Sequence, residues 1–176
     1  MESSIYLRAA KIIGVTGAAW LGGNIAALSL MATPALRRST AEDGVSASAV
    51  SRQWRYIYEA GKAQNPPIAV ITAAAYLYLA WSARRVVASL GPLSLYYGSA
   101  AVLTLGIVPF TLIAMSATNN KLIRHSDAAS KGPSTPLQPP GDEEVEGLIA
   151  KWTTLNGIRS LLPLAGGVLG AVAMLA

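Results

Sequence analysis

One histidine and a small set of carboxylates, amides and arginines carry the chemistry that this sequence can offer. His125 and Asp127 lie six to nine residues beyond Thr118 and Asn119. Because histidine titrates near neutral pH, His125 with Asp127 is the candidate for proton transfer from an acidic carbon. The candidate donors to the resulting oxyanion are Asn119, Asn156, Arg55 and Arg159. A lone histidine beside Arg124 is equally consistent with a solvated side chain.

Aromatic residues close to these groups suggest a flat substrate. Trp54 and Tyr58 are spaced i, i+4, as are Arg55 and Glu59, which places each pair on one face of a short helix. The expected substrate-binding residues are Trp54, Arg55, Tyr58, Asn24, Trp152 and Asn156. The tryptophans are also consistent with anchors at a membrane interface, and Asn24 with a hydrogen bond between helices.

Composition and motifs exclude several other chemistries. The chain has no cysteine and one histidine, which rules out thiolate ligands, a cysteine nucleophile and a histidine-rich metal site. No phosphate loop, dinucleotide-binding pattern, zinc-protease motif or nucleophile elbow occurs. The net charge is +5, but the cations form no single stripe, so nucleic acid is rejected as a partner. We therefore predict a site without metal or cofactor.

The elements that must position these residues are predicted to be membrane helices. The 176 residues are 52% hydrophobic and 13% charged, whereas an average soluble domain is roughly 25% charged. Apolar runs at 12–31, 67–83, 93–115 and 161–176 are near the ~17 to 25 residues needed to cross a bilayer. The predicted fold is all-α, an integral membrane four-helix bundle with a short surface helix in the first loop.

One domain, residues 1–176, is expected to account for the whole length. Helices are expected at about 8–33, 66–86, 93–122 and 143–175, with loops 34–65 and 123–142 on the same face. Pro66 and Pro67 should stop the surface helix, residues 51–62, and start the second membrane helix. The first apolar run exceeds the ~7 to 15 residues of a signal-peptide core, so we predict a retained helix. The distribution of cations leaves the membrane orientation open.

Small residues and one proline predict how the helices pack. Gly14, Ala18, Gly22 and Ala26 form a ridge at intervals of four, and Gly166 and Gly170 repeat the device near the carboxyl end. Such ridges let a neighbouring backbone approach closely in lipid. Pro109 frees the carbonyl of Leu105, so a kink is expected in the third membrane helix. Asn24 should face the interior of the bundle, because an unpaired amide in lipid is costly.

A family resemblance runs through nearly the whole chain. The residues that carry it are Pro34, Leu36, Trp54, Tyr58 and Gly61, then Pro109, Phe110, Thr111, Met115, Thr118, Asn119 and Leu122, and finally Trp152, Leu155, Asn156, Arg159, Pro163 and Leu164. In order and placement they resemble the DUF1772 integral membrane family, and most closely its fungal anthrone oxygenases. By the family pattern, Trp54, Tyr58, Asn119, Asn156 and Arg159 would line the pocket.

The resemblance implies a cofactor-independent monooxygenase that converts an anthrone-type aromatic polyketide to a quinone with dioxygen. Its partners would be a small lipophilic aromatic substrate, dioxygen and the bilayer of a fungal endomembrane. A homo-oligomer stays open. Two rival functions also stay open: a cofactor-free cyclase or isomerase that uses the same base, and a non-catalytic membrane scaffold that binds partner helices through the Gly14 and Gly166 ridges.

Overall fold

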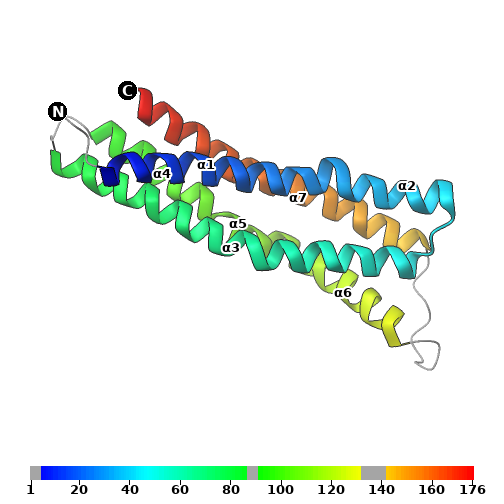
Figure 1. Ribbon diagram of the computed structural model, residues 1–176. Coiled ribbons are helices and arrows are strands. Elements are labelled where there is room, and N and C mark those ends of the chain that lie inside the picture. Colours follow the sequence, from blue (N-terminus) through cyan, green and yellow to red (C-terminus); the bar gives the residue numbers. More distant parts are fainter. Residues whose placement is uncertain (1–4, 87–90, 132–141) are drawn as a thin grey trace. The chain divides into compact units, whose positions relative to one another are not determined.

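The structure, a computed structural model, describes residues 5–86, 91–131 and 142–176, and all regular elements within these ranges are helical. Figure 1 labels the α-helices in chain order. The elements are α1 (Ile5–Ala27), the π-helical segment η1 (Leu28–Ala32), α2 (Thr33–Asp43), α3 (Ala47–Val86), α4 (Gly91–Leu105), α5 (Ile107–Phe110), the π-helical segment η3 (Thr111–Met115), α6 (Ser116–Lys131) and α7 (Asp142–Leu175).

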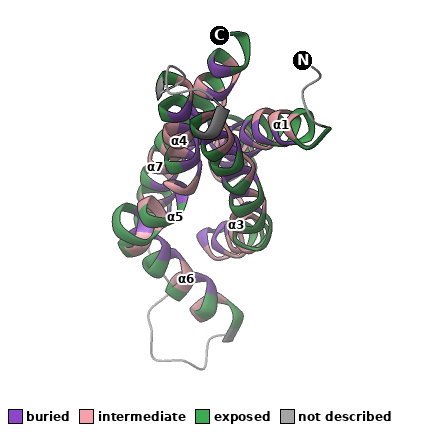
Figure 2. Ribbon diagram, turned by 90° about the vertical axis from the view of Figure 1, so that its left-hand side faces the viewer, coloured by how far each residue is buried: buried purple, intermediate pink, exposed green. Residues whose placement is uncertain are grey.

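Four helical stretches among the described residues are long and apolar enough to cross a membrane. They are Ile5–Asp43, Ala47–Arg84, Pro92–Ser130 and Glu143–Leu175. Each helix carries buried residues along one side and exposed residues along the other (Figure 2). In a membrane protein the exposed side is apolar as well, as Ile12, Trp20 and Leu95 illustrate here. The predicted all-α, four-helix membrane bundle is confirmed.

The helices form two compact units, and each unit contains a stretch of all four. Unit 1 comprises Met1–Asn24, Gln64–Pro109 and Arg159–Ala176, and unit 2 comprises Ile25–Ala63 and Phe110–Ile158. The core of unit 1 is rich in alanine and includes Tyr76 and Tyr97. The core of unit 2 is built around Trp54 and Trp152. Whether the chain acts as a single membrane domain stays a prediction.

The helices are longer than the sequence predicts, and the expected loops are largely helical. Pro66 and Pro67 lie inside α3 rather than at a helix start, so residues 51–62 form the first half of α3 and not a separate surface helix. The two prolines leave the carbonyls of Lys62 and Ala63 without an intrahelical donor. Both of these residues are exposed, so water can donate hydrogen bonds to their carbonyls. Residues 34–43 and 123–131 are likewise helical.

The kink predicted at Pro109 is a longer interruption of the helix. The turn at Gly106 separates α4 from α5, and the π-helical η3 follows Pro109 directly. The amide of Gly106 donates to the carbonyls of Val102 and Leu103, at 2.9 and 3.1 Å. A second π-helical segment, η1, joins α1 to α2 without a break in the ribbon (Figure 1). π-Helical turns inside α-helices are rare and recur at functional sites.

Close packing in unit 1 depends on the glycines of the predicted ridges. The ring of Tyr76 lies between α1 and α7, where a Cβ on Gly14 or Gly170 would come within 2.6 or 2.5 Å of it. A Cβ on Gly166 would lie 2.9 Å from the carbonyl oxygen of Ala100 on α4. The chain's own helices therefore occupy these glycine faces. The scaffold hypothesis, which needs them for partner helices, loses its main support.

Asn24 faces the interior of unit 1, as predicted. Its Nδ2 donates to Oδ1 of Asn65 at 2.9 Å, and Asn65 is buried. The hydrogen bond between α1 and α3 explains the asparagine in an apolar helix, which favours the structural alternative over substrate binding.

Candidate functional site

A buried cluster of three aromatic rings lies at the centre of unit 2. Trp54 stacks on Tyr58 one turn along α3, with ring centroids 5.1 Å apart and an interplanar angle of 16°. Trp152 of α7 meets Trp54 edge to face, at 5.9 Å and 88°. Both indoles are almost fully buried, at 0% and 2% exposure. The i, i+4 spacing read from the sequence thus gives one continuous aromatic surface.

Helix α6 closes this aromatic cluster with a face that is partly polar. Met115 and Leu122 belong to the same buried core as the two tryptophans. Asn119 lies between them on the same side of α6 and is 4% exposed. Thr118 is also buried on this helix. An amide is therefore placed beside an aromatic surface inside an otherwise apolar core.

Several polar atoms in this core have no hydrogen-bond partner among the described residues. They are the indole Nε1 of Trp54, the indole Nε1 of Trp152 and the amide Oδ1 of Asn119. Buried polar groups are nearly always satisfied by protein, water or ligand, so these three atoms can take a water molecule or a ligand as their partner. Two of the atoms are donors and the third is an acceptor.

Contacts between side chains of opposite charge type flank the cluster. They place His125 and Asp127, which the sequence groups together, beside different partners. His125 Nε2 lies 3.6 Å from Oε1 of Glu144 on α7. Asp127 instead lies 4.0 Å from Nη1 of Arg55 on α3, and Arg55 Nε also pairs with Glu59 at 2.9 Å. The carboxylate beside His125 is therefore Glu144 and not Asp127. Arg55 Nε is taken by Glu59, whereas its buried Nη1 has no hydrogen-bond partner among the described residues.

Asn156 is fully buried, but its amide hydrogens are already used. Nδ2 donates to the carbonyl oxygen of Ile25 and to Oγ of Ser29, both at 2.9 Å. Ile25 lies near the carboxyl end of α1, and Ser29 lies in the π-helical segment η1 that follows it. These hydrogen bonds join α7 to α1 and η1, and the role of Asn156 as an oxyanion donor stays a prediction.

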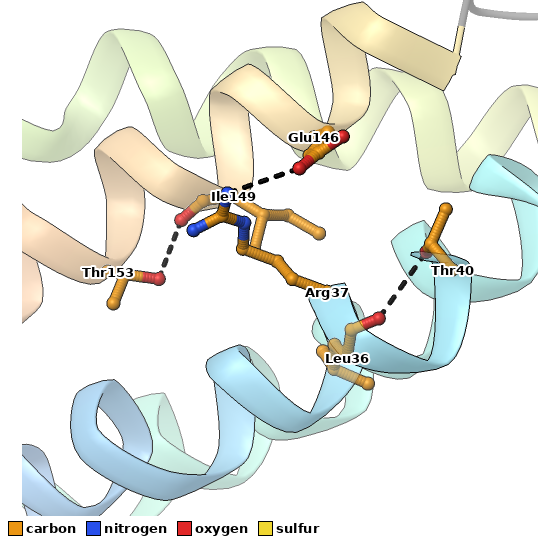
Figure 3. A network of polar contacts seen from close by, with 6 residues as sticks. All are labelled: Leu36, Arg37, Thr40, Glu146, Ile149 and Thr153. Atoms are coloured by element: carbon orange, nitrogen blue, oxygen red, sulfur yellow. Dashed lines mark hydrogen bonds and ion pairs between the residues drawn. The ribbon is translucent and has the colours of Figure 1, made fainter. Parts of the chain in front are cut away.

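An ion pair joins α2 to α7 (Figure 3). Arg37 Nη2 pairs with Oε1 of Glu146 at 3.1 Å, and both side chains are about half exposed. Oγ1 of Thr153 bonds to Oγ1 of Thr33 at 2.7 Å. Beneath the ion pair is a crevice of about 10 Å³, room for roughly one water molecule. Its lining is Arg37, Thr40, Ala47, Val50, Val145, Glu146 and Ile149.

The structure places most, but not all, of the predicted site residues in unit 2. Those within this unit are Trp54, Arg55, Tyr58, Asn119, His125, Asp127, Trp152 and Asn156. Asn24 and Arg159 belong to unit 1, where Arg159 is half-buried on α7. No group of three or more potential metal ligands occurs within the described ranges.

Glu144 is the partner that sequence reasoning missed. Glu144 lies in the first turn of a helix, where the helix dipole favours a carboxylate. The sequence therefore gives no reason to expect that it contacts a histidine. Nothing in the spacing of His125 and Glu144 links them, because they lie on different helices on either side of a long polar segment. Only the packing of α6 against α7 brings the two side chains together.

Comparison with known proteins places the chain in a family. A family model described as anthrone oxygenase matches residues 54–169. An anthrone oxygenase of Aspergillus fumigatus is 42% identical over 172 residues, which cover 94% of this chain and 92% of that protein. An anthrone oxygenase of Paecilomyces divaricatus is 34% identical over 163 residues, covering 93% of each chain.

A noranthrone monooxygenase of Aspergillus flavus is 34% identical over 161 residues, which cover 91% of this chain and 70% of that protein. No solved structure shows a significant match to the chain. The family match begins at Trp54 and includes Tyr58, Asn119 and Trp152, so it contains the whole aromatic cluster described above. The chain belongs to the anthrone oxygenase family.

Proposed function

We propose that this protein is an anthrone oxygenase, a monooxygenase that converts an anthrone-type aromatic polyketide to a quinone with dioxygen. The observation that carries this proposal is the buried cluster of Trp54, Tyr58 and Trp152, which lies within the family match. Aromatic faces at stacking distance suit a flat, lipophilic ligand. The names of the relatives supply the chemical class of that ligand.

The reaction needs only a base and dioxygen. The methylene of an anthrone is acidified by the ketone across the ring, so removal of one proton gives an electron-rich anthrolate. The anthrolate passes an electron to dioxygen, and the resulting radical and superoxide combine to form a carbon–oxygen bond. The hydroperoxide then loses water, which leaves the second ketone of the quinone. One oxygen atom enters the product and the other leaves as water, so no external reductant is consumed.

His125 is the proposed base, and Glu144 is the proposed positioning residue behind it. In the proposed mechanism Glu144, 3.6 Å from the imidazole Nε2, helps to orient the ring. Six residues of helix separate His125 from Asn119, about 9 Å along α6 at 1.5 Å per residue. In the proposed complex the substrate lies along α6 between them, and the proton reaches His125 directly or through one water.

The surface of unit 2 fits a substrate that arrives through lipid. Leu30, Met31 and Ile113 are 76%, 72% and 81% exposed, beside the helices that carry the aromatic cluster. Such exposed apolar side chains belong in a bilayer. We therefore place the enzyme in a membrane, with an endomembrane of a fungal cell as the proposed location, and we expect its substrate to partition there.

Oxygen consumption by membranes that contain the protein tests this function. An anthrone is supplied without nicotinamide, flavin or added metal, and dioxygen uptake and quinone absorbance are recorded together. We expect both signals to rise in a one-to-one ratio, well above membranes from cells without the gene. A rate equal to that of the empty membranes would refute the oxygenase. Conversion of the anthrone without dioxygen uptake would instead support the cyclase or isomerase.

A further inference from the structure

The unsatisfied polar atoms of the aromatic cluster define what the site recognises. Trp54 and Trp152 each bury an indole N–H, and Asn119 buries a carbonyl oxygen, with no partner among the residues that the structure describes. A hydrogen bond that these groups make with water in the unfolded chain is lost on burial, so each group favours a ligand that replaces it.

Contacts between the rings cannot satisfy both indoles. Trp54 stacks on Tyr58 through one face, and only one of the two tryptophans can direct its edge at the other in an edge-to-face pair. An N–H over an aromatic face is also a weak hydrogen bond. At least one strong donor and the acceptor of Asn119 therefore remain for a ligand.

The arrangement points to an oxygen-bearing aromatic ligand of a particular kind. A ketone oxygen or its enolate has lone pairs for N–H donors, whereas a phenolic hydroxyl can donate to an amide oxygen. We propose that Trp54 and Trp152 donate their indole N–H groups to the ketone oxygen of the substrate, and that Asn119 Oδ1 accepts from a hydroxyl next to that ketone. The substrate class is thus a hydroxylated aryl ketone.

This inference deepens the proposed function and rests on it for the aromatic ketone. In the anthrolate the ketone oxygen carries the negative charge, so the same indole donors would stabilise the ionised substrate more than the neutral one. Asn156 is less suited to that task, because its amide hydrogens are donated to Ile25 and Ser29, whereas Arg55 binds Glu59 through Nε only and is a further candidate donor through Nη1. From the sequence the tryptophans are expected to bind the substrate or to anchor the helices at the membrane interface. In the proposed complex they also donate hydrogen bonds to the substrate.

Binding of unreactive ligands tests the inference separately from turnover. The purified full chain in detergent is titrated with 1-hydroxyanthraquinone, anthraquinone and anthracene, and dissociation constants are measured by equilibrium dialysis. Trp54→Phe and Trp152→Phe keep an aromatic ring but remove the N–H. We expect each variant to bind both quinones about 5- to 10-fold more weakly, as for loss of one hydrogen bond, and to bind anthracene almost unchanged.

Trp20 supplies the control, and Asn119 tests the proposed contact with the hydroxyl. Trp20 is 57% exposed in unit 1, so Trp20→Phe should leave all three affinities unchanged. The wild type should prefer 1-hydroxyanthraquinone to anthraquinone, and Asn119→Leu should abolish that preference. Circular dichroism and size-exclusion chromatography confirm that each variant is folded.

Three results would overturn the inference. The first is quinone binding unaffected by either Phe variant, which would mean that water alone satisfies the indoles. The second is an equal loss for anthracene, which would assign the tryptophans to packing. The third is a hydroxyl preference that survives in Asn119→Leu. If the affinities change as expected but anthrone drives no oxygen uptake, the recognition site stands and the oxygenase fails.

Discussion

His125 and Glu144 are the residues proposed as the catalytic base and its positioning partner. Their 3.6 Å separation joins α6 to α7 at the edge of the core that holds Trp54 and Trp152. The imidazole keeps 19% of its side chain exposed, whereas the Glu144 side chain is 52% exposed. The imidazole is therefore mostly buried, whereas the carboxylate beside it is open to solvent.

Replacement of His125 should affect turnover far more than binding. A positioned general base typically contributes about 100- to 10,000-fold, so His125→Ala should lower kcat for anthrone oxidation by at least about 100-fold. The affinity for 1-hydroxyanthraquinone should stay within about twofold of the wild type. Glu144→Gln should lower kcat less, by about 10-fold, because it removes orientation and not the base itself.

The matched control for these variants is Arg124→Ala, which removes an exposed charge next to His125. It should leave kcat unchanged. Wild-type turnover in His125→Ala would mean that another group removes the proton. Activity is followed as quinone absorbance in the first seconds after mixing with an air-saturated buffer.

Helical spacing predicts which side chains share a face, but not which of their atoms are already bonded. Trp54, Tyr58 and Asn119 could be placed at one site from the sequence because their phase and their polarity agree. Asn156 has the same signal, yet both of its amide hydrogens are taken by Ile25 and Ser29. Those acceptors become available only through packing against η1, which no local pattern in the sequence encodes.

Among the helices, close approach in unit 1 is set by glycine. Gly14 on α1 faces the ring of Tyr76, and a Cβ there would lie 2.6 Å from Cε1 and 2.9 Å from Cδ1. Tyr76 is fully buried and is held on its other side by Gly170. A Cβ on Gly14 would therefore press on a ring that is already fully buried.

Substitution of two glycines on the same helix should therefore have opposite effects. Gly14→Ala should lower the free energy of unfolding by about 1–3 kcal/mol, the usual cost of overpacking a filled core. Gly23→Ala, where no atom lies within 4 Å, should raise it by about 0.5–1 kcal/mol through helix propensity. Thermal unfolding in detergent, followed by circular dichroism, gives both signs. Equal effects in the two variants would mean that α1 does not pack through Gly14.

Element boundaries are where sequence patterns predict least in this chain. The apolar runs and the glycine ridges are predictable because each reports on burial of a whole face. Pro66 and Pro67 signal a helix start by the local rule, but α3 continues through them. The lost hydrogen bonds fall on exposed residues, and buried contacts on both sides, such as Trp54 and Tyr76, hold the helix in line.

For the molecule as a whole, helix length and apolar surface determine its relation to the membrane. The four stretches that can cross a bilayer contain 39, 38, 39 and 33 residues. These exceed the roughly 20 residues of a minimal span, so each helix extends beyond the hydrocarbon layer. If all four stretches cross the bilayer, the carboxyl end of α2 and the amino end of α7 should lie at the same membrane face.

The natural absence of cysteine makes this topology directly testable. Single variants Asp43→Cys and Glu143→Cys, near those two helix ends, should react alike with a membrane-impermeant maleimide in sealed vesicles. Ile5→Cys, at the other end of α1, should show the opposite accessibility. If Asp43→Cys and Glu143→Cys react in intact vesicles, Ile5→Cys should react only after permeabilisation. If those two react only after permeabilisation, Ile5→Cys should react in intact vesicles. The wild type supplies a background without thiols. Opposite behaviour of Asp43→Cys and Glu143→Cys would rule out four crossings, because helices α3 and α4–α6 would then not both span the bilayer.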